Sequence, residues 1–301
     1  MNIINTNPIS TNQSPVQTGR VTTEGDDLYY EVRGQGQPIL LISAGDGEYY
    51  AALMDLLSDE YKVITYDRRA NARSTINAPQ NFEISQQSRD AVAILQAVGE
   101  TSAFVFGNSA GAVVALDMAV TQPQAVRAVV AHEAPLVRVL PQVRKWQGFF
   151  ARVYATAFRF GSSAAGLRFL LGAQLPAWKL IRSQSVASEY LKHHRDHHDE
   201  PRIDAKTAAD VQIKLELLPV TNYLPDIERI KQNGIEVFIA AGTWSLKRKA
   251  WYAQAACILA KQLDCELVAL PGHHGSYVDM PQEWATSLRT LFHKVGVAVN
   301  S

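Results

Sequence analysis

The chain has 301 residues, 47% of them hydrophobic, and its 29 Lys and Arg residues balance 29 Asp and Glu residues. A chain of this length is expected to form one domain with a large hydrophobic core and an inserted segment, rather than two independent domains. The zero net charge does not favour a nucleic-acid backbone or an anionic lipid surface as a partner. With only two cysteines, neither a disulfide framework nor a cysteine metal site is expected.

The first twenty residues are polar and lack the cationic start and apolar core of a secretory signal. No later stretch approaches the roughly 18 consecutive apolar residues of a membrane span. We therefore expect a loose N-terminal tail over residues 1–20 and a cytoplasmic protein with no membrane partner.

Short apolar runs with β-branched content follow the tail and alternate with stretches of helical periodicity. Most of the runs are apolar throughout, as in parallel strands that are covered on both faces. The alternation predicts an α/β fold with a mostly parallel central sheet and helices on both faces. The expected strands are 28–33, 38–43, 62–67, 102–107, 127–133, 236–242 and 266–272, and the expected helices are about 48–59, 84–99, 110–122, 249–263 and 281–294.

The alternation stops over residues 135–222, which contain helical stretches but no convincing strand. We interpret this region as a helical cap inserted into a core formed by residues 21–134 and 223–301. Aromatic residues recur at helical spacing over 145–160 and are expected to pack inside the cap, or alternatively to wall an apolar pocket. Trp178 in the cap is a further candidate to face such a pocket.

The most specific motif lies in "FVFGNSAGAVVALDMA", residues 104–119. Gly107, Ser109 and Gly111 form G-x-S-x-G directly after an apolar strand and directly before an alanine-rich helix. That order is typical of a nucleophile elbow, a tight turn that presents a serine at the carboxyl end of a sheet. Ser109 is therefore the predicted nucleophile, and an incidental serine in a tight turn is the alternative.

A serine hydroxyl needs a base to take its proton, and the base is expected after the last strand. The segment "LPGHHGSYVDMPQEW", residues 270–284, offers His273 and His274. His274 precedes Pro281 and the following helix by the spacing that is common for a catalytic histidine. We therefore predict His274 as the base and His273 as a supporting residue.

Acyl transfer also needs donors for the developing oxyanion. One is expected to be the amide of Ala110, which follows the nucleophile. The second is expected from the loop "ISAGDGEYY", residues 42–50, where Gly45 permits close backbone approach and the Asp46 amide is the alternative. Asp46 is also a candidate substrate contact.

The base in turn needs a carboxylate that holds its tautomer. After the strand at 236–242 the chain carries Ser245 where serine hydrolases often have an aspartate. Glu133 is the first acidic residue past the strand at 127–133 and lies at the carboxyl edge of the predicted sheet. We predict Glu133 as the acid, with a surface ion pair to Arg138 as its alternative role.

These motifs resemble the α/β-hydrolase superfamily over nearly the whole chain and, more narrowly, the fungal zearalenone lactone hydrolases. The narrower resemblance rests on "DGE" at 46–48, the S-A-G elbow at Ser109, "HE-x-P" at 132–135 and "LPG-x-H" at 270–274. In that family a glutamate in the HE-x-P segment is the triad acid, which implies Glu133 here.

The resemblance implies an α/β-hydrolase fold and a two-step cleavage of a small ester or lactone through an acyl-enzyme, with no metal or organic cofactor. The cap does not match that family, so the resemblance identifies no particular substrate. A slow ligand receptor, a carbon–carbon bond hydrolase and a cofactor-free haloperoxidase-like enzyme would use a similar constellation and stay open as alternatives. The histidines at 193, 194, 197 and 198 are expected on a solvated helix or loop rather than at a metal. The sequence leaves the oligomeric state open.

Overall fold

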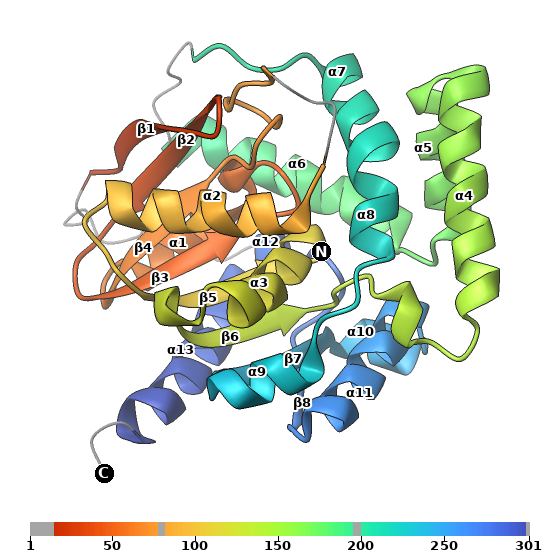
Figure 1. Ribbon diagram of the computed structural model, residues 1–301. Helices are drawn as coiled ribbons and strands as arrows, with labels where there is room; N and C mark the ends of the chain where they lie inside the picture. Colours follow the sequence, from red (N-terminus) through yellow and green to blue (C-terminus); the bar gives the residue numbers. More distant parts are fainter. Residues whose placement is uncertain (1–14, 78–81, 195–199, 299–301) are drawn as a thin grey trace, which may run out of the picture.

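The computed structural model describes residues 15–77, 82–194 and 200–298. Residues 1–14 of the expected tail lie outside these ranges, as do His197 and His198 of the histidine cluster. Figure 1 shows a twisted central sheet with helices on both faces and a further group of helices set to one side of it. The predicted α/β fold is confirmed.

The sheet has eight strands in the order β1-β2-β4-β3-β5-β6-β7-β8. The first two pairings in this order are antiparallel and the remaining five are parallel. The strands are β1 (Gln17–Thr23), β2 (Asp26–Arg33), β3 (Gln37–Ile42), β4 (Tyr61–Tyr66), β5 (Ala103–Asn108), β6 (Val126–His132), β7 (Glu236–Gly242) and β8 (Leu267–Leu270).

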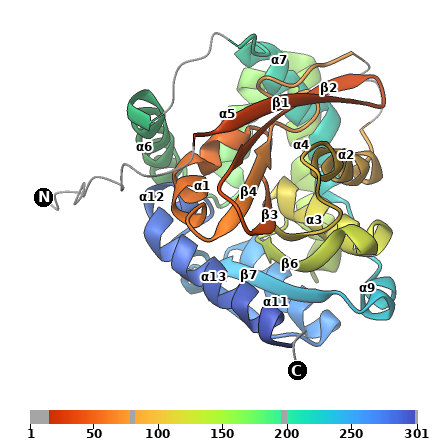
Figure 2. The ribbon, with the colours of Figure 1, turned by 90° about the vertical axis from the view of Figure 1, so that its left-hand side faces the viewer.

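Both faces of the parallel strands are buried, which explains their continuous apolar runs. Leu40 and Val105 face a core that includes residues of α2, α3 and α11, while the neighbouring Leu41 and Phe104 face a second core with α1 and α13. Figure 2 shows α1 and α13 together on one side of the sheet. The bounds are η1 (Gly47–Tyr50), α1 (Ala51–Leu57), α2 (Ile84–Ala97), α3 (Ala110–Thr121), η2 (Pro123–Ala125), α10 (Thr243–Lys247), α11 (Trp251–Leu263), α12 (Ser276–Asp279) and α13 (Pro281–Ala298).

Between β6 and β7 the described chain is helical. Of its expected aromatic stripe, Trp146 and Phe150 are buried, whereas Phe158 and Phe160 at the end of α4 are exposed. The two buried residues belong to the main core, together with residues of β5, α3 and α11, so this part of the stripe does not pack inside the inserted helices as expected. The helices are η3 (Val137–Val139), α4 (Val143–Phe160), α5 (Ser162–Gly172), α6 (Ala177–His194), α7 (Ala205–Asp210), the π-helix η4 (Val211–Glu216), α8 (Leu217–Thr221) and α9 (Ile227–Asn233).

The structure differs from the sequence prediction at the N-terminal edge. Strand β1 begins at Gln17, inside the segment expected as a loose tail, and pairs antiparallel with β2. Apart from Val21, its side chains are polar, and they are largely exposed, so the strand lacks the hydrophobic pattern of the other strands. In the described part of the chain, no helix is both long and apolar enough to cross a bilayer.

Candidate active site

Ser109 occupies the turn between β5 and α3 with φ 56° and ψ −119°, a backbone conformation that residues with a side chain rarely adopt. Its amide donates to the carbonyl oxygen of His132 at 3.0 Å, which ties the turn to the end of β6. The serine thus stands at the carboxyl edge of the sheet, at the start of a helix. This is the geometry that the G-x-S-x-G motif predicts.

The two glycines of the motif are required by close packing. A Cβ on Gly111 would lie 1.9 Å from the carbonyl oxygen of Ile42, and one on Gly107 would lie 2.3 Å from that of Gly111. Both contacts are with backbone atoms, so no side-chain rotation could relieve them. The two glycines are therefore needed because helix α3 packs closely against β3 and β5.

Glu133 follows β6 directly and is completely buried. Its Oε1 accepts the Gly242 amide at 2.8 Å, and its Oε2 lies 2.7 Å from Nδ1 of His274. The Glu133 amide extends the β6–β7 pairing by donating to the Ala240 carbonyl at 3.0 Å. The carboxylate is therefore held by backbone on one side and faces the histidine ring on the other.

Burial by itself would raise the pKa of Glu133, but neighbouring His132 and the hydrogen bond from His274 outweigh it and lower the pKa. The carboxyl is consequently ionised at neutral pH. Burial lowers the pKa of His132 from 6.5 to about 4, so this ring is neutral under the same conditions. Glu133 is then the charged, buried partner of His274.

The two adjacent histidines have different surroundings. His274 turns toward Glu133, and its side chain is 13% exposed. His273 is buried, and its Nδ1 accepts the Gly275 amide at 3.2 Å within the turn. Ser245, at the position without an aspartate, is also fully buried. No ion pair joins Glu133 to Arg138 among the described residues.

The two backbone amides expected to bind the oxyanion differ in whether they already donate a hydrogen bond. Ala110 is the first residue of α3, where helix amides have no intrahelical acceptor. The Gly45 amide donates to the Ser43 hydroxyl at 3.1 Å, so a ligand oxygen would have to replace that hydroxyl. The hydroxyl of Ser109 itself forms no hydrogen bond within the described chain, including to His274.

A buried ion pair supports the loop that carries Gly45. Arg68 is fully buried, and its Nη2 lies 2.6 Å from Oε2 of Glu216 at the end of the π-helix η4. The same guanidinium donates to the carbonyls of Ser43, at 3.1 Å, and Ala44. Sequence reasoning missed this pairing, because the two charges are 148 residues apart and neither lies in a motif.

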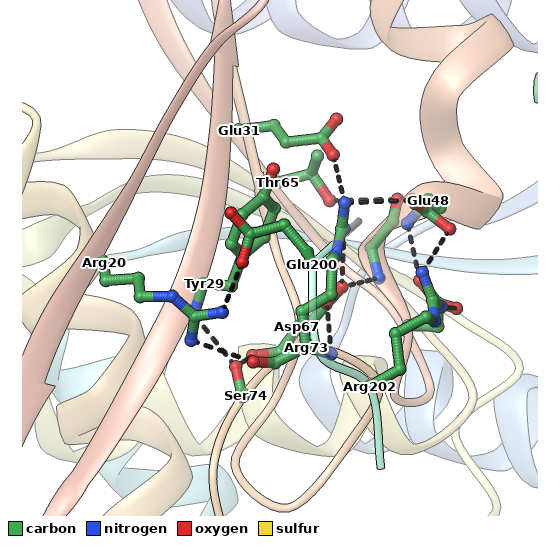
Figure 3. Close-up of polar contacts among 12 residues, drawn as sticks. Arg20, Tyr29, Glu31, Glu48, Thr65, Asp67, Arg73, Ser74, Glu200 and Arg202 are labelled. Atoms are coloured by element: carbon green, nitrogen blue, oxygen red, sulfur yellow. Dashed lines mark hydrogen bonds and ion pairs between the residues drawn. The ribbon is translucent and has the colours of Figure 1, made fainter. Parts of the chain in front are cut away.

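A second charged network, shown in Figure 3, also contacts this loop. Arg73 contacts Asp67 and Glu31, each at 2.6 Å, and Glu48 at 3.0 Å. Arg202, which follows α6, reaches the other oxygen of Glu48 at 2.8 Å. The network connects the loop after β3 to the loop after β4 and to the cap segment.

Arg202 also contacts Asp46, with Nη2 and Oδ2 2.5 Å apart. Burial, followed by the charges of Asp67 and Glu48, raises the pKa of Asp46 to about 7 in spite of Arg202. Asp46 is therefore protonated more easily than an ordinary exposed carboxyl. It lies next to the Gly45 amide, where such a change alters the charge at the pocket wall.

A pocket with a volume of about 830 Å³ opens above Ser109, between the sheet edge and the helices that follow β6. Trp178 does not line it, contrary to the sequence prediction. This side chain is 64% exposed, because it lies on the outer side of α6, whereas Leu180 and Ser183 of that helix face the pocket. The other predicted residues share the lining: Ser109, Glu133, His274, Gly45, Ala110 and Asp46.

Within residues 15–77, 82–194 and 200–298, no cluster of three or more His, Cys, Asp or Glu side chains is arranged to hold a metal ion. His193 pairs instead with Glu189 on the exposed side of α6, at 2.9 Å. The described half of the histidine cluster thus lies on a solvated helix.

Comparison with known proteins places the chain in a family. Residues 37–241 match the profile described as the alpha/beta hydrolase fold. The uncharacterized hydrolase YraK of Bacillus subtilis (strain 168) is 25% identical over 286 residues, which cover 93% of this chain and 97% of that protein. The profile spans more than half of the sequence, so the chain belongs to the α/β hydrolase family, and the protein is a hydrolase.

Solved structures show the same fold. A thermophilic esterase from Thermogutta terrifontis matches with a TM-score of 0.70 at 17% identity, covering 93% of this chain and 99% of that one. The enol-lactonase from Burkholderia xenovorans LB400 matches with a TM-score of 0.67 at 16% identity, covering 91% and 100%. At such identities the likeness concerns the fold alone.

Proposed function

We propose that the protein hydrolyses carboxylic esters, and in particular lactones with an apolar body, through a Ser109–His274–Glu133 triad. The observation that carries the proposal is the 2.7 Å contact between Glu133 Oε2 and His274 Nδ1, in the pocket that Ser109 also lines. An ionised, buried carboxylate on Nδ1 keeps the proton on that nitrogen and leaves Nε2 free to act as a base.

In the first step, His274 Nε2 takes the proton of the Ser109 hydroxyl while the serine oxygen attacks the ester carbonyl carbon. Glu133 stabilises the imidazolium that forms and keeps its own charge. The absence of a Ser109–His274 hydrogen bond is compatible with this role, because catalytic hydrogen bonds often tighten only when substrate is bound. Breakdown of the tetrahedral adduct passes the proton from His274 to the leaving alkoxide.

The amides of Ala110 and Gly45 would stabilise the negative oxygen of that adduct. The Gly45 amide would exchange the Ser43 hydroxyl for the substrate oxygen, while Arg68 holds the Ser43 and Ala44 carbonyls in place. Water activated by His274 then cleaves the acyl-enzyme and restores Ser109. With a lactone, the alcohol stays attached to the acyl chain and a single hydroxy acid leaves.

The pocket supports a substrate with an apolar body. Its volume is that of a site for a medium-sized organic ligand. Apolar side chains form much of the wall, while polar groups gather around Ser109 and along the loop at Asp46. The apolar lining includes Phe150, Phe169, Leu175, Leu180, Leu217 and Trp251.

The proposal is tested by incubating the protein with zearalenone and with simple p-nitrophenyl esters and separating the products by chromatography. We expect hydrolysis of both substrate types by the wild type and none by Ser109→Ala. Ester cleavage without lactone opening would retain the triad and reject the lactone assignment. Ligand binding without any product would favour a receptor, and hydrolysis by Ser109→Ala would reject the serine mechanism.

A further inference from the structure

Helices α5 and α6 expose large apolar side chains on the outside of the molecule. Leu167 and Leu171 are one turn apart on α5, and Trp178 and Ile181 share one side of α6. Each is at least 60% exposed, and Leu171 reaches 81%. We call these four residues the outer apolar face. Contiguous exposed apolar patches mark interaction surfaces, whereas a single exposed apolar side chain is ordinary, so the two pairs on consecutive helices are the feature to explain.

The same two helices also have an apolar inner side. Phe169 and Leu170 of α5, together with Leu180 of α6, line the pocket. Leu170 contacts both the pocket and solvent, because it lines the pocket and its side chain is 42% exposed. The outer apolar face is therefore the reverse side of the pocket wall, and α5 lies away from the sheet at the periphery of the molecule (Figure 1).

Charge is strongly segregated onto this part of the chain. Residues 143–194 contain eight Lys and Arg residues and one acidic residue, Glu189, a formal charge of +7. The rest of the chain, with 21 basic and 28 acidic residues, carries −7. None of the basic side chains from Arg144 to Arg182 pairs with a carboxylate of the described residues. These side chains are Arg144, Lys145, Arg152, Arg159, Arg168, Lys179 and Arg182.

We propose that the outer apolar face docks onto an anionic lipid surface, with Trp178 and the leucines at the depth of the headgroups and the surrounding basic residues against the lipid charges. Aliphatic and tryptophan side chains flanked by unpaired Lys and Arg are the features by which a helix binds such an interface without crossing it. Arg168 and Arg182 are exposed on the same two helices.

The charge argues against a second copy of this chain as the occupant. Two copies that paired through this face would bring the exposed Arg168 and Arg182 of both copies together, and Glu189 is the one acidic residue of α5 and α6 that could compensate them. We expected no membrane partner because the net charge of the whole chain is zero. That sum hides the positive charge of residues 143–194, which the negative charge of the other residues cancels. The docking proposal concerns a surface and does not depend on the proposed chemistry.

Tryptophan fluorescence tests the proposal directly. Of the five tryptophans, Trp146, Trp251 and Trp284 are buried and Trp244 is partly covered, so Trp178 dominates any change at the surface. We expect a blue shift with vesicles of phosphatidylcholine containing about one-third phosphatidylglycerol, and a loss of that shift at high salt. Vesicles of phosphatidylcholine alone should produce little shift.

Two variants with the same change of charge separate specific docking from general repulsion. Ile181→Glu should weaken vesicle partition about tenfold. Leu224→Glu, at a 45% exposed position between α8 and α9, should bind as the wild type does. Removing charge with Arg168→Gln and Arg182→Gln should also weaken binding, and thermal melting checks that each variant folds.

Three results with vesicles would overturn the proposal: no binding to either vesicle type, equal binding to both, or an equal loss of binding in Ile181→Glu and Leu224→Glu. A dimer in sedimentation velocity that Ile181→Glu disperses, without vesicle binding, would also overturn it and assign the face to self-association.

Discussion

At the scale of single residues, the buried Glu133 is the central feature of the site. In the proposed triad it takes the role of an aspartate after β7, where the chain has Ser245, and its carboxylate approaches His274 from the end of the neighbouring strand β6. The substitution works geometrically because β6 and β7 are adjacent and parallel, so their carboxyl ends meet at one edge. A carboxylate from either strand end can therefore reach the same histidine.

Glu133→Gln tests the proposed role of this carboxylate. The amide cannot hold the proton on Nδ1 as a carboxylate does, so kcat should fall by about 10⁴-fold, as in comparable triad changes. Steady-state kinetics on a p-nitrophenyl ester measures the loss, and thermal melting confirms the fold. Glu189→Gln makes the same chemical change on an exposed part of α6 and should leave kcat unchanged. Near wild-type turnover in Glu133→Gln would exclude it from the triad.

His132 provides a pH-dependent contribution to stability. Burial lowers its pKa from 6.5 to about 4, so between these values the unfolded chain binds a proton that the folded protein does not. The contribution of His132 to the free energy of unfolding is about 3 kcal/mol. It is fully present above pH 6.5 and is lost as the pH falls toward 4. The charged or titratable groups around it are Glu133, His273 and His274.

Urea unfolding across this pH range, in the wild type and in His132→Gln, measures that contribution. The variant should lose less free energy of unfolding on acidification than the wild type, even if its stability at neutral pH is lower. Parallel pH profiles for the two proteins would show that His132 does not titrate in this way.

At the scale of secondary-structure elements, the π-helix η4 joins the cap region to the loop after β3. Its last residue, Glu216, neutralises the buried Arg68, which in turn holds two carbonyls of that loop. The wider turn of a π-helix is often found at functional sites. Here the π-helix η4 ends at Glu216, which contacts Arg68 of the core. The Glu216–Arg68 ion pair thereby links two regions that are distant in sequence.

Glu216→Gln should reduce stability by about 3 kcal/mol, because it leaves the Arg68 charge buried without its partner. Urea denaturation measures this change, and Glu189→Gln again provides a matched glutamate on an exposed helix. We also expect lower turnover in Glu216→Gln, since Arg68 positions the loop that carries Gly45. A variant as stable as the wild type would show that the ion pair does not hold the cap to the core.

At the scale of the whole molecule, the sequence predicted the elements whose patterns are local. The parallel strands and the elbow were recognisable because burial on both faces demands continuous apolar runs, and close packing demands Gly107 and Gly111. Glu133 could be predicted as a candidate because an acidic residue directly after a buried strand lies at the sheet edge. Its pairing with His274 was also predicted, because the base needs a carboxylate and the strand at 236–242 ends without an aspartate, and the structure adds the 2.7 Å distance between Oε2 and Nδ1.

The features that escaped prediction depend on tertiary contacts or on weak patterns. Strand β1 is a polar edge strand, and only its pairing with β2 identifies it. Trp178 shares a helix with pocket residues but points outward, which its sequence spacing alone did not decide. The charge excess of residues 143–194, however, was present in the sequence and would have emerged from a count by region rather than over the whole chain.

The most direct test of the account is covalent labelling with a p-nitrophenyl alkylphosphonate, followed by intact-protein and peptide mass spectrometry. A nucleophilic Ser109 activated by His274 should take up one phosphonyl group, release one equivalent of p-nitrophenol and lose esterase activity in step. Ser109→Ala should remain unlabelled. Labelling at another residue with loss of activity, or an unlabelled protein that still hydrolyses esters, would contradict the assignment of Ser109 and the triad built on it.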